Sequence, residues 1–516
     1  MAAAIVVPER FNAAALFLDR HVADGRAERT AFRFAGRAVT YGHIAERANR
    51  LGNALRARGV QIEQRVLLAV PDRPEFAEAF WGAIKIGAVP IPVSDTLPAE
   101  ELAFLLHDSR ARAVIASEAA AAQIARIRKP SPWLESVIAL GPAPGALDYE
   151  SLLAQASPEL AAADTSRDDV ALWVYTSGST GAPKAAVHLH HDLVYSAELV
   201  GRGVFDIGPG DLVFSVSKLN FSFGLGNSLL FPGLVGGASV LMPERPEAEH
   251  IFELIQAERP TVLFAVATIY RRLLQVEGAE RRFDLSSLRL CVSSGETLPV
   301  TLFHTWKSRF GHELLDVVGS TEALHDFIAN RPGEVRPGSC GRVIPGYEAR
   351  LVDDEGRPVA PGLVGHLLIK GDSTAPYYWN RHERTKATML GEWLRTGDMF
   401  YQDTEGYFYF CARGDDMLKV GGMWVSPAEV EAALGEHPAV VEAAVVGRGD
   451  TDGLTKPHAF CVLRDGVAGS EALAAELREQ VRKRLAGYKS PRWVDFVAEL
   501  PRTSTGKIQR FALRKR

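Results

Sequence analysis

The chain has 516 residues, of which 47% are hydrophobic and 23% are charged, and 63 acidic residues slightly outnumber 58 basic ones. The net charge of −5 and the pI near 6.3 give no general attraction to nucleic acid or to an anionic membrane. This length exceeds what one hydrophobic core usually organises, so we expect three or more folded units.

Neither the cysteines nor the N-terminal segment indicates export. Cys291, Cys340, Cys411 and Cys461 stand far apart without a CxxC pair, which favours buried thiols in a reducing compartment. The N-terminal segment lacks the basic region of a signal peptide, and no apolar run is long enough to span a bilayer. The sequence therefore predicts a cytoplasmic protein without membrane spans.

Strand and helix patterns alternate over most of the chain. Residues 41–59 carry apolar side chains at helical spacing, residues 66–70 form an apolar strand pattern, and residues 75–86 form a second helical pattern. Further strand patterns lie at residues 113–115, 239–241, 262–266 and 288–293. This alternation predicts an α/β fold with parallel sheets covered by helices.

The pattern changes from about Gly341 onward. Short alternating runs such as 347–352 and 365–369 are separated by turn residues, which predicts a small antiparallel β unit. We expect this unit to belong to a large N-terminal domain that covers residues 1–414.

Residues 415–516 have the size of a separately folding domain. Helical patterns begin at Pro427 and span 471–485, while strand patterns span 440–446 and 458–463. The sequence therefore predicts a small α+β C-terminal domain.

A glycine-rich loop follows the apolar run 170–175. Residues 175–184 read YTSGSTGAPK, and the glycines allow backbone N–H groups to converge on an anion. The spacing differs from GxxxxGK[ST], so a Walker-type kinase or GTPase is disfavoured. Taken alone, the loop is also compatible with a flexible surface turn.

Four later segments combine glycine, hydroxyl and charged residues. These are DVVGSTE at 316–322, WLRTGD at 393–398, ARGDDMLKVGG at 412–422 and PRTSTGK at 501–507. The Glu322 carboxylate could hold a hard cation that bridges phosphates, and Asp398 could accept hydrogen bonds from a ribose. Taken singly, Glu322 is also compatible with an ordinary acid at a helix N-terminus, and Lys507 with a solvated surface lysine.

In this order, the five segments resemble the acyl-adenylate-forming superfamily, which includes acyl-CoA synthetases, firefly luciferase and nonribosomal peptide adenylation domains. The resemblance covers essentially the whole chain and implies ATP, Mg²⁺ and coenzyme A as cofactors. It implies that the catalytic residues are Lys507, Glu322 and Thr321, with Glu322 as the Mg²⁺ ligand. The implied nucleotide and CoA contacts are Thr176, Ser177, Gly178, Ser179, Thr180, Gly181, Lys184, Gly295, Glu296, Thr297, Asp316, Val317, Asp398, Arg413, Lys419, Gly421 and Gly422.

The resemblance also implies a two-step reaction and a mobile C-terminal domain. A carboxylate would first attack the α-phosphorus of ATP, and Lys507 would bridge the reacting oxygens. Rotation about a hinge at Asp415 would then bring residues 413–422 to the site for attack by CoA. Val318 stands where the superfamily often has tyrosine, which leaves adenine stacking at that position open.

Within the superfamily, the segments 217–227 and 318–330 look like those of benzoate-CoA ligases. That branch implies an aromatic carboxylic acid as substrate, in a pocket lined by Ser222, Phe223, Gly319, His325 and Asp326. The small Gly319 would leave a flat slot for the ring.

Asp326 departs from the pattern of simple benzoate ligases, because the resemblance implies an apolar residue at this position. We hypothesise that its carboxylate accepts a hydrogen bond from a ring amino or hydroxyl group, which favours 2-aminobenzoate. The alternative is that Asp326 points away from the ring or pairs with a nearby basic side chain.

Other possibilities stay open at this stage. The acyl group could be passed to a carrier protein instead of free CoA, and the protein could be a monomer or a homodimer. A non-catalytic nucleotide-binding protein is disfavoured because Lys184, Glu322, Asp398 and Lys507 occur together. His188, His190 and His191 lack fitting metal-ligand partners in sequence, so we interpret them as part of a strand-to-helix connection.

Overall fold

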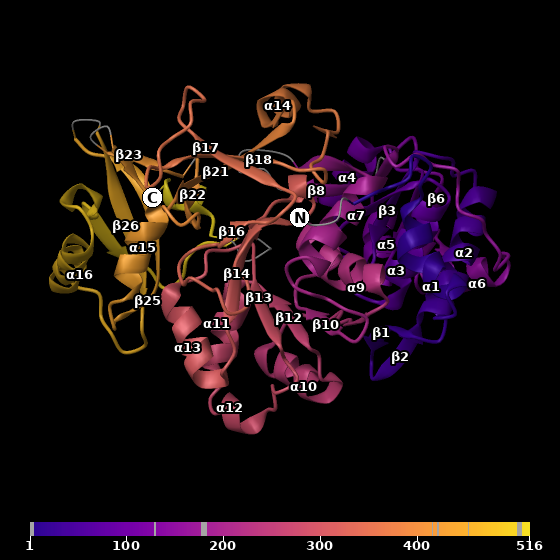
Figure 1. Ribbon diagram of the computed structural model, residues 1–516, viewed down its shortest axis with the longest axis horizontal. Helices are drawn as coiled ribbons and strands as arrows, with labels where there is room; N and C mark the ends of the chain where they lie inside the picture. The colour runs from indigo at the N-terminus through magenta and orange to yellow at the C-terminus, as the bar shows by residue number, and fades with distance from the viewer. Residues whose placement is uncertain are drawn as a thin grey trace.

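The structure is a computed structural model that describes residues 5–127, 131–176, 183–414, 416–420, 423–451, 454–502 and 508–515. The N-terminal helices and strands lie on one side of the molecule, and the C-terminal elements lie on the opposite side (Figure 1). In the described ranges, no helix is long and apolar enough to cross a membrane.

The largest sheet has nine strands in the order β16-β15-β14-β13-β12-β10-β11-β1-β2. Its six central strands pair in parallel, whereas β2, β15 and β16 pair antiparallel with their neighbours. The strands are β1 (Thr30–Phe34), β2 (Arg37–Thr40), β10 (Leu212–Ser215), β11 (Ala238–Val240), β12 (Val262–Ala265), β13 (Leu290–Ser293), β14 (Leu314–Gly319), β15 (Asp326–Ala329) and β16 (Arg342–Val343).

A second, entirely parallel sheet has the order β4-β3-β5-β6-β7. Its strands are β3 (Arg65–Ala69), β4 (Val89–Pro92), β5 (Ala113–Ala116), β6 (Ser136–Ala139) and β7 (Leu147–Asp148). The central strands β3 and β5 are buried along almost their whole length, because helices cover parallel sheets on both faces.

Helices surround these two sheets. The helices up to residue 200 are α1 (Arg20–Ala23), α2 (Tyr41–Ala57), α3 (Pro74–Lys85), α4 (Ala99–Ser109), α5 (Glu118–Ala125), α6 (Tyr149–Ala154) and α7 (His190–Ser196). Those that follow are α8 (Ser222–Leu225), α9 (Phe231–Val235), α10 (Ala248–Glu258), α11 (Ala267–Gln275), α12 (Ala279–Arg282) and α13 (Val300–Phe310). Helices α2 and α3 pack closely because they meet at glycines: a Cβ on Gly82 would lie 2.8 Å from the carbonyl oxygen of Ala48.

Two antiparallel sheets complete the large part of the molecule. Strands β8 (Val170–Thr176), β9 (Lys184–Leu189) and β19 (Tyr377–Tyr378) form a sheet in the order β19-β9-β8. Strands β17 (Glu348–Val352), β18 (Gly365–Lys370), β20 (Met389–Leu390), β21 (Trp393–Gln402) and β22 (Phe408–Arg413) form the other, and α14 (His382–Thr388) lies between β19 and β20 in the chain. The antiparallel unit predicted after Gly341 is therefore present.

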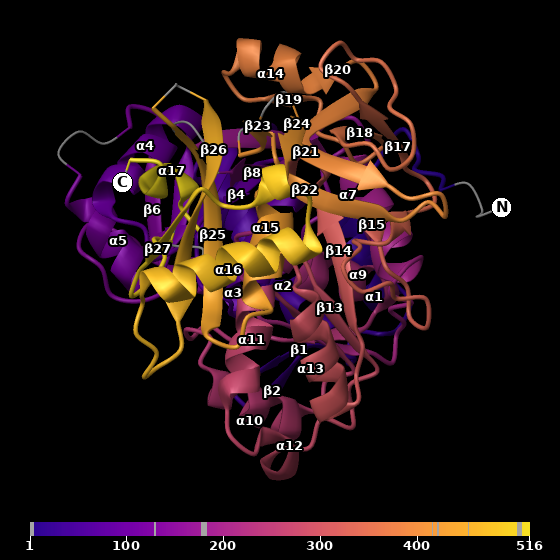
Figure 2. The ribbon, with the colours of Figure 1, turned by 90° about the vertical axis from the view of Figure 1, so that its left-hand side faces the viewer.

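The last hundred residues form a separate core. Strands β25 (Val440–Gly449), β26 (Thr455–Leu463) and β27 (Trp493–Phe496) form a sheet that packs with α15 (Pro427–Gly435) and α16 (Glu471–Arg484). The hairpin of β23 (Leu418–Val420) and β24 (Met423–Val425) precedes this core, and α17 (Arg510–Leu513) follows it. Figure 2 shows α16, β25 and β26 in front of the large sheets.

The predicted elements and the fold class are confirmed. For example, the patterns at 41–59, 75–86 and 471–485 correspond to α2, α3 and α16, with ends that differ by no more than two residues. All four cysteines are free and buried, as expected.

Candidate active site

The glycine-rich loop connects two neighbouring antiparallel strands. Thr176 at the end of β8 is directly opposite Lys184 at the start of β9. The loop is therefore followed by a strand, unlike a Walker loop, which is followed by a helix. The predicted phosphate contacts Ser177, Gly178, Ser179, Thr180 and Gly181 lie outside the described residues, whereas Thr176 and Lys184 lie within them.

Lys184 and Glu322, which are 138 residues apart in sequence, meet in space. The Lys184 Nζ atom lies 3.1 Å from Oε1 of Glu322, and their side chains are 18% and 15% exposed. The hydroxyl of Tyr378 on β19 donates to the same carboxylate oxygen and accepts from Lys184. Lys184 also lies 3.8 Å from the centre of the Tyr378 ring. Two of the predicted site residues therefore share one contact network.

The electrostatics of this network favour an ionised Glu322. Burial alone would raise the pKa of Glu322, but the Lys184 ammonium and the Tyr378 hydroxyl outweigh that effect, so the pKa is lowered. Burial lowers the pKa of Lys184, an effect that Glu322 opposes. Burial and the adjacent carboxylate raise the pKa of Tyr378, so it remains a neutral hydrogen-bond donor.

Glu322 belongs to a short 3₁₀ turn, Thr321–Ala323, that follows β14. Each carbonyl of the turn accepts a hydrogen bond from a different residue. His188 Nε2 lies 2.8 Å from the Thr321 oxygen, the Ala375 amide lies 2.7 Å from that of Glu322, and the Ser373 hydroxyl lies 2.8 Å from that of Ala323. The next residue, Leu324, has a positive φ of 65°.

Three predicted nucleotide-binding residues, Gly295, Glu296 and Thr297, follow strand β13. Gly295 and Thr297 are exposed, while the Glu296 carboxylate accepts a 2.8 Å hydrogen bond from the Thr268 amide. Asp316 is buried on β14, which raises the pKa of its carboxyl group. Its neighbour Val317 is also buried.

Asp398 and Arg413 lie opposite each other on β21 and β22. Arg413 Nη1 is 3.0 Å from Asp398 Oδ1, and the Asp398 side chain is only 9% exposed whereas that of Arg413 is 52% exposed. The two residues predicted to contact ribose and phosphate are therefore adjacent on neighbouring strands.

Asp326 and His325 lie at the start of β15, next to the aromatic side chains of α8 and α9. The His325 ring lies 5.3 Å from Phe223 and 4.5 Å from Phe231 between ring centres. His325 Nδ1 lies 3.0 Å from Asp326 Oδ2, and the Ser294 hydroxyl donates to Asp326 Oδ1 at 2.9 Å. Asp326 is 1% exposed and His325 is 2% exposed, whereas Ser222 and Phe223 are partly exposed.

Gly319 lies where β14 approaches β15. A Cβ at Gly319 would lie 2.4 Å from the His325 carbonyl oxygen and 2.7 Å from Asp326 Cα. In the direction of a Cβ, the backbone of His325 and Asp326 fills the space beside Gly319. The glycine is needed for the close approach of the two strands.

We expect Gly319→Ala to lower the free energy of unfolding by about 1–3 kcal/mol because it overpacks this contact. Urea denaturation would measure the change. Gly435→Ala is a matched control, because a Cβ at Gly435 meets nothing within 4 Å. Equal stability of the two variants would contradict this account of Gly319.

Several predicted residues lie outside the described part of the chain. They are Lys507, Gly421, Gly422 and the expected hinge residue Asp415. The backbone of Lys419 is described, and it pairs with Trp424 in the β23–β24 hairpin.

Comparison with known proteins places the chain in a family. The AMP-binding enzyme family matches residues 19–379, and the AMP-binding enzyme C-terminal domain matches residues 429–507. The chain is 45% identical over 513 residues to benzoate–CoA ligase of Thauera aromatica. The matched region covers 99% of this chain and 97% of that relative. The chain belongs to the AMP-binding enzyme family, in its aryl-CoA ligase branch.

Solved structures of this AMP-binding family agree with the fold. An anthranilate CoA ligase in complex with anthranoyl-AMP superposes with a TM-score of 0.93 at 40% identity, covering 99% of this chain and 98% of that one. A benzoate CoA ligase from Burkholderia xenovorans LB400 has a TM-score of 0.89 at 43% identity, covering 98% and 100%. As a member of this branch, the chain is an AMP-forming acid–thiol ligase.

Sequence reasoning missed several residues that contact the predicted site residues. Tyr378 reaches Glu322 because β19 pairs with β9, which places Tyr378 opposite Ala186. Ser373 and His188 hold the Thr321–Ala323 turn. Ser294, which precedes the predicted nucleotide contact Gly295, donates to Asp326. The sequence shows two adjacent tyrosines at 377 and 378, but nothing in their spacing links either of them to Glu322.

Proposed function

We propose that this aryl-CoA ligase activates a benzoate with ATP as an aryl-adenylate and transfers the aryl group to CoA, with 2-aminobenzoate as its preferred acid. The juxtaposition of Lys184 and Glu322 supports the adenylation step. The similarity to benzoate–CoA ligase and to anthranilate–CoA ligase of Pseudomonas aeruginosa, 35% identical over 465 residues, supports the aromatic acid.

The donor set fits the Mg²⁺ that the family implies. Mg²⁺ is usually bound by one or two carboxylates together with substrate phosphates and water, and Glu322 supplies one such carboxylate. Lys184 and Tyr378 both contact Oε1, so they do not occupy Oε2. Among the residues that the structure describes, no group of three or more His, Cys, Asp or Glu could form a metal cage. Bound at Glu322, Mg²⁺ would neutralise charge on the ATP phosphates.

The chain's own residues then act by positioning and charge neutralisation. The Lys184 ammonium is paired with Glu322. When ATP binds, a phosphate group of ATP can serve as a second counterion for the same ammonium. The carboxylate of the acid attacks the α-phosphorus, a P–O bond forms, and the bond to pyrophosphate breaks. In the second step the CoA thiol loses its proton and forms a C–S bond, and AMP leaves with the electron pair of the broken C–O bond.

The surroundings of Asp326 support an acid with a hydrogen-bond donor on its ring. Oδ1 accepts from Ser294, but Oδ2 accepts no hydrogen bond from any described residue, although His325 Nδ1 lies 3.0 Å away. This pairing corresponds to the alternative in which Asp326 meets a basic side chain. Both readings are compatible with an amino group that donates to Oδ2, because a carboxylate oxygen has more than one acceptor site.

We expect kcat/KM for 2-aminobenzoate to exceed kcat/KM for benzoate. Asp326→Asn should lower the ratio of these two kcat/KM values by about 10-fold or more, as for loss of a hydrogen bond to a charged group. Thioester formation with CoA, measured over a panel of benzoates and hydroxybenzoates, would test this. Ser294→Ala is the matched control, because it removes a partner of Asp326 and leaves the acceptor in place. A wild-type enzyme that prefers benzoate would refute the proposed acid.

A further inference from the structure

His188, on β9, is a buried imidazole with a polar partner at each ring nitrogen. It has no solvent exposure. Its Nδ1 lies 2.8 Å from Asp192 Oδ2, and its Nε2 lies 2.8 Å from the Thr321 carbonyl oxygen. A carbonyl oxygen can only accept a hydrogen bond, so Nε2 of the ring donates to Thr321. Asp192 contacts the other ring nitrogen, Nδ1, so both nitrogens of the ring are held by neighbouring groups.

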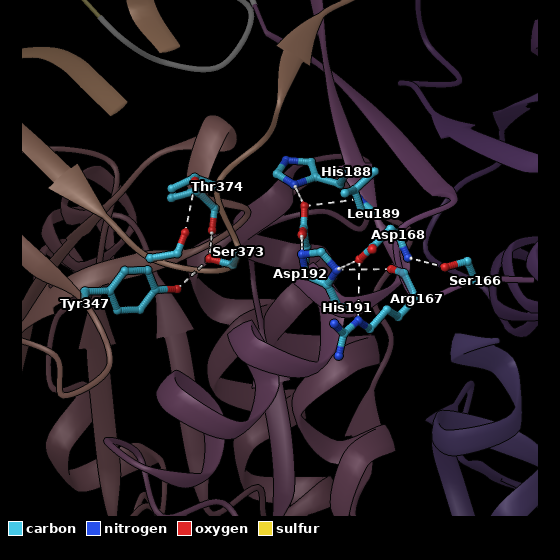
Figure 3. Close-up of polar contacts among 12 residues, drawn as sticks. Ser166, Arg167, Asp168, His188, Leu189, His191, Asp192, Tyr347, Ser373 and Thr374 are labelled. Atoms are coloured by element: carbon cyan, nitrogen blue, oxygen red, sulfur yellow. Dashed lines mark hydrogen bonds and ion pairs between the residues drawn. The ribbon is translucent and has the colours of Figure 1, made fainter. Parts of the chain in front are cut away.

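Asp192 is fixed by further contacts of its carboxylate. It lies in the first turn of α7, is fully buried, and accepts a 3.1 Å hydrogen bond from the Leu189 amide. His191 Nε2 lies 3.1 Å from its other oxygen, and His191 Nδ1 lies 3.1 Å from the exposed Asp168. Figure 3 shows Asp192 between His188 and His191. The position of His188 is thus set by α7 as well as by β9.

The same strand contacts the Thr321–Ala323 turn at two points. Lys184 and His188 are four residues apart on β9, so they project from the same face of the strand. Lys184 contacts the Glu322 side chain, and His188 contacts the backbone carbonyl of Thr321. On the other side of the turn, Ser373 bonds Ala323 and is itself bonded to Tyr347 at 2.6 Å (Figure 3).

We infer that His188 and Asp192 are positioning residues for adenylation, which hold the Thr321 carbonyl so that Glu322 faces Lys184. This inference rests on the proposed function. Without hydrogen on Nε2, the Thr321 carbonyl loses its hydrogen bond to His188, and on this side the turn is no longer tied to β9. Thr321 and Glu322 then sample other positions, so the rate of the chemical step falls while binding of the aromatic acid changes little.

His188→Gln and Asp192→Asn test the inference. We expect each to lower kcat for acid-dependent pyrophosphate release about 10- to 100-fold, as for groups that orient a ligating side chain, while KM for the aromatic acid stays within about two-fold of wild type. His190→Gln is the matched control. His190 is also buried, but it accepts a hydrogen bond from the Ala13 amide, far from the turn in sequence and in its contacts.

A second measurement does not depend on activity. In ¹⁵N-histidine NMR spectra, wild-type His188 should show a hydrogen on Nε2, the nitrogen that contacts the Thr321 carbonyl oxygen. Hydrogen on Nδ1 alone would overturn the inference. So would equal losses of kcat and melting temperature in His188→Gln and His190→Gln, because these indicate a merely structural role. A wild-type protein that releases no pyrophosphate with any benzoate would instead refute the proposed function.

Discussion

Glu322→Gln is expected to lower acid-dependent pyrophosphate release by about 10²- to 10³-fold, the usual loss when a preorganised charged group is removed from a reacting centre. The amide has nearly the same shape as the carboxylate but carries no charge. It can neither hold a hard cation as strongly nor balance the partly buried Lys184 ammonium 3.1 Å away. Continuous pyrophosphate detection at saturating ATP would measure the loss.

The pH dependence of stability should change in the same variant. In the wild type, Lys184 and Tyr378 lower the pKa of Glu322 against the effect of burial. A carboxyl group with a lowered folded-state pKa stabilises the fold above its unfolded pKa, and this stabilisation is lost as the pH falls through the lowered value. Glu322→Gln should therefore show a smaller decrease in melting temperature between neutral and acidic pH.

Tyr378→Phe is the matched control for Glu322→Gln. It removes a hydrogen bond to the same carboxylate oxygen and leaves the charge in place. We expect a cost of about 1 kcal/mol, or roughly five-fold in rate. If Tyr378→Phe and Glu322→Gln reduced pyrophosphate release equally, the carboxylate charge would not be the important property of Glu322.

Local patterns in the sequence were sufficient to predict the elements and the fold class. The helical spacing at 41–59 reflects a helix with one buried face, and the apolar runs at 66–70 and 262–266 reflect buried strands. Such patterns are formed by residues that are close together in the sequence, so they can be recognised without the structure. The order of the motifs also indicated that Lys184 and Glu322 belong to one site, and the structure brings them together.

Contacts made by irregular segments could not be predicted in this way. Tyr378 reaches Lys184 only because the two-residue strand β19 pairs with β9, nearly 200 positions earlier in the chain. Asp326 was noticed as a carboxylate at an unexpected position, but its contacts with Ser294 and His325 depend on the register of β15. The sequence could assign His188 to a strand-to-helix connection, but no spacing rule links it to the Thr321 carbonyl.

Lys507→Ala is expected to separate the two half-reactions. Lys507 lies outside the described residues, in the segment between Arg502 and Ile508, which pair with each other as an antiparallel bridge. Arg502 contacts Glu442 on β25, and Arg271 of α11 lies 3.2 Å from the same carboxylate, so the base of this segment is tied to the large part of the molecule. A lysine that reaches the acid and the α-phosphate from there would neutralise charge as the P–O bond forms.

We expect Lys507→Ala to lower pyrophosphate release by about 10²-fold or more. Thioester formation from supplied aryl-AMP should stay within about two-fold of wild type, because the charge that this lysine neutralises develops only in the first step. Rapid-quench assays of each half-reaction would measure both rates, with the exposed Lys515→Ala as the control for loss of a C-terminal positive charge. Equal losses in both half-reactions would mean that Lys507 acts on the aryl-AMP itself or on the fold, because a group that acts only while the carboxylate attacks phosphorus cannot slow the later attack by the thiol.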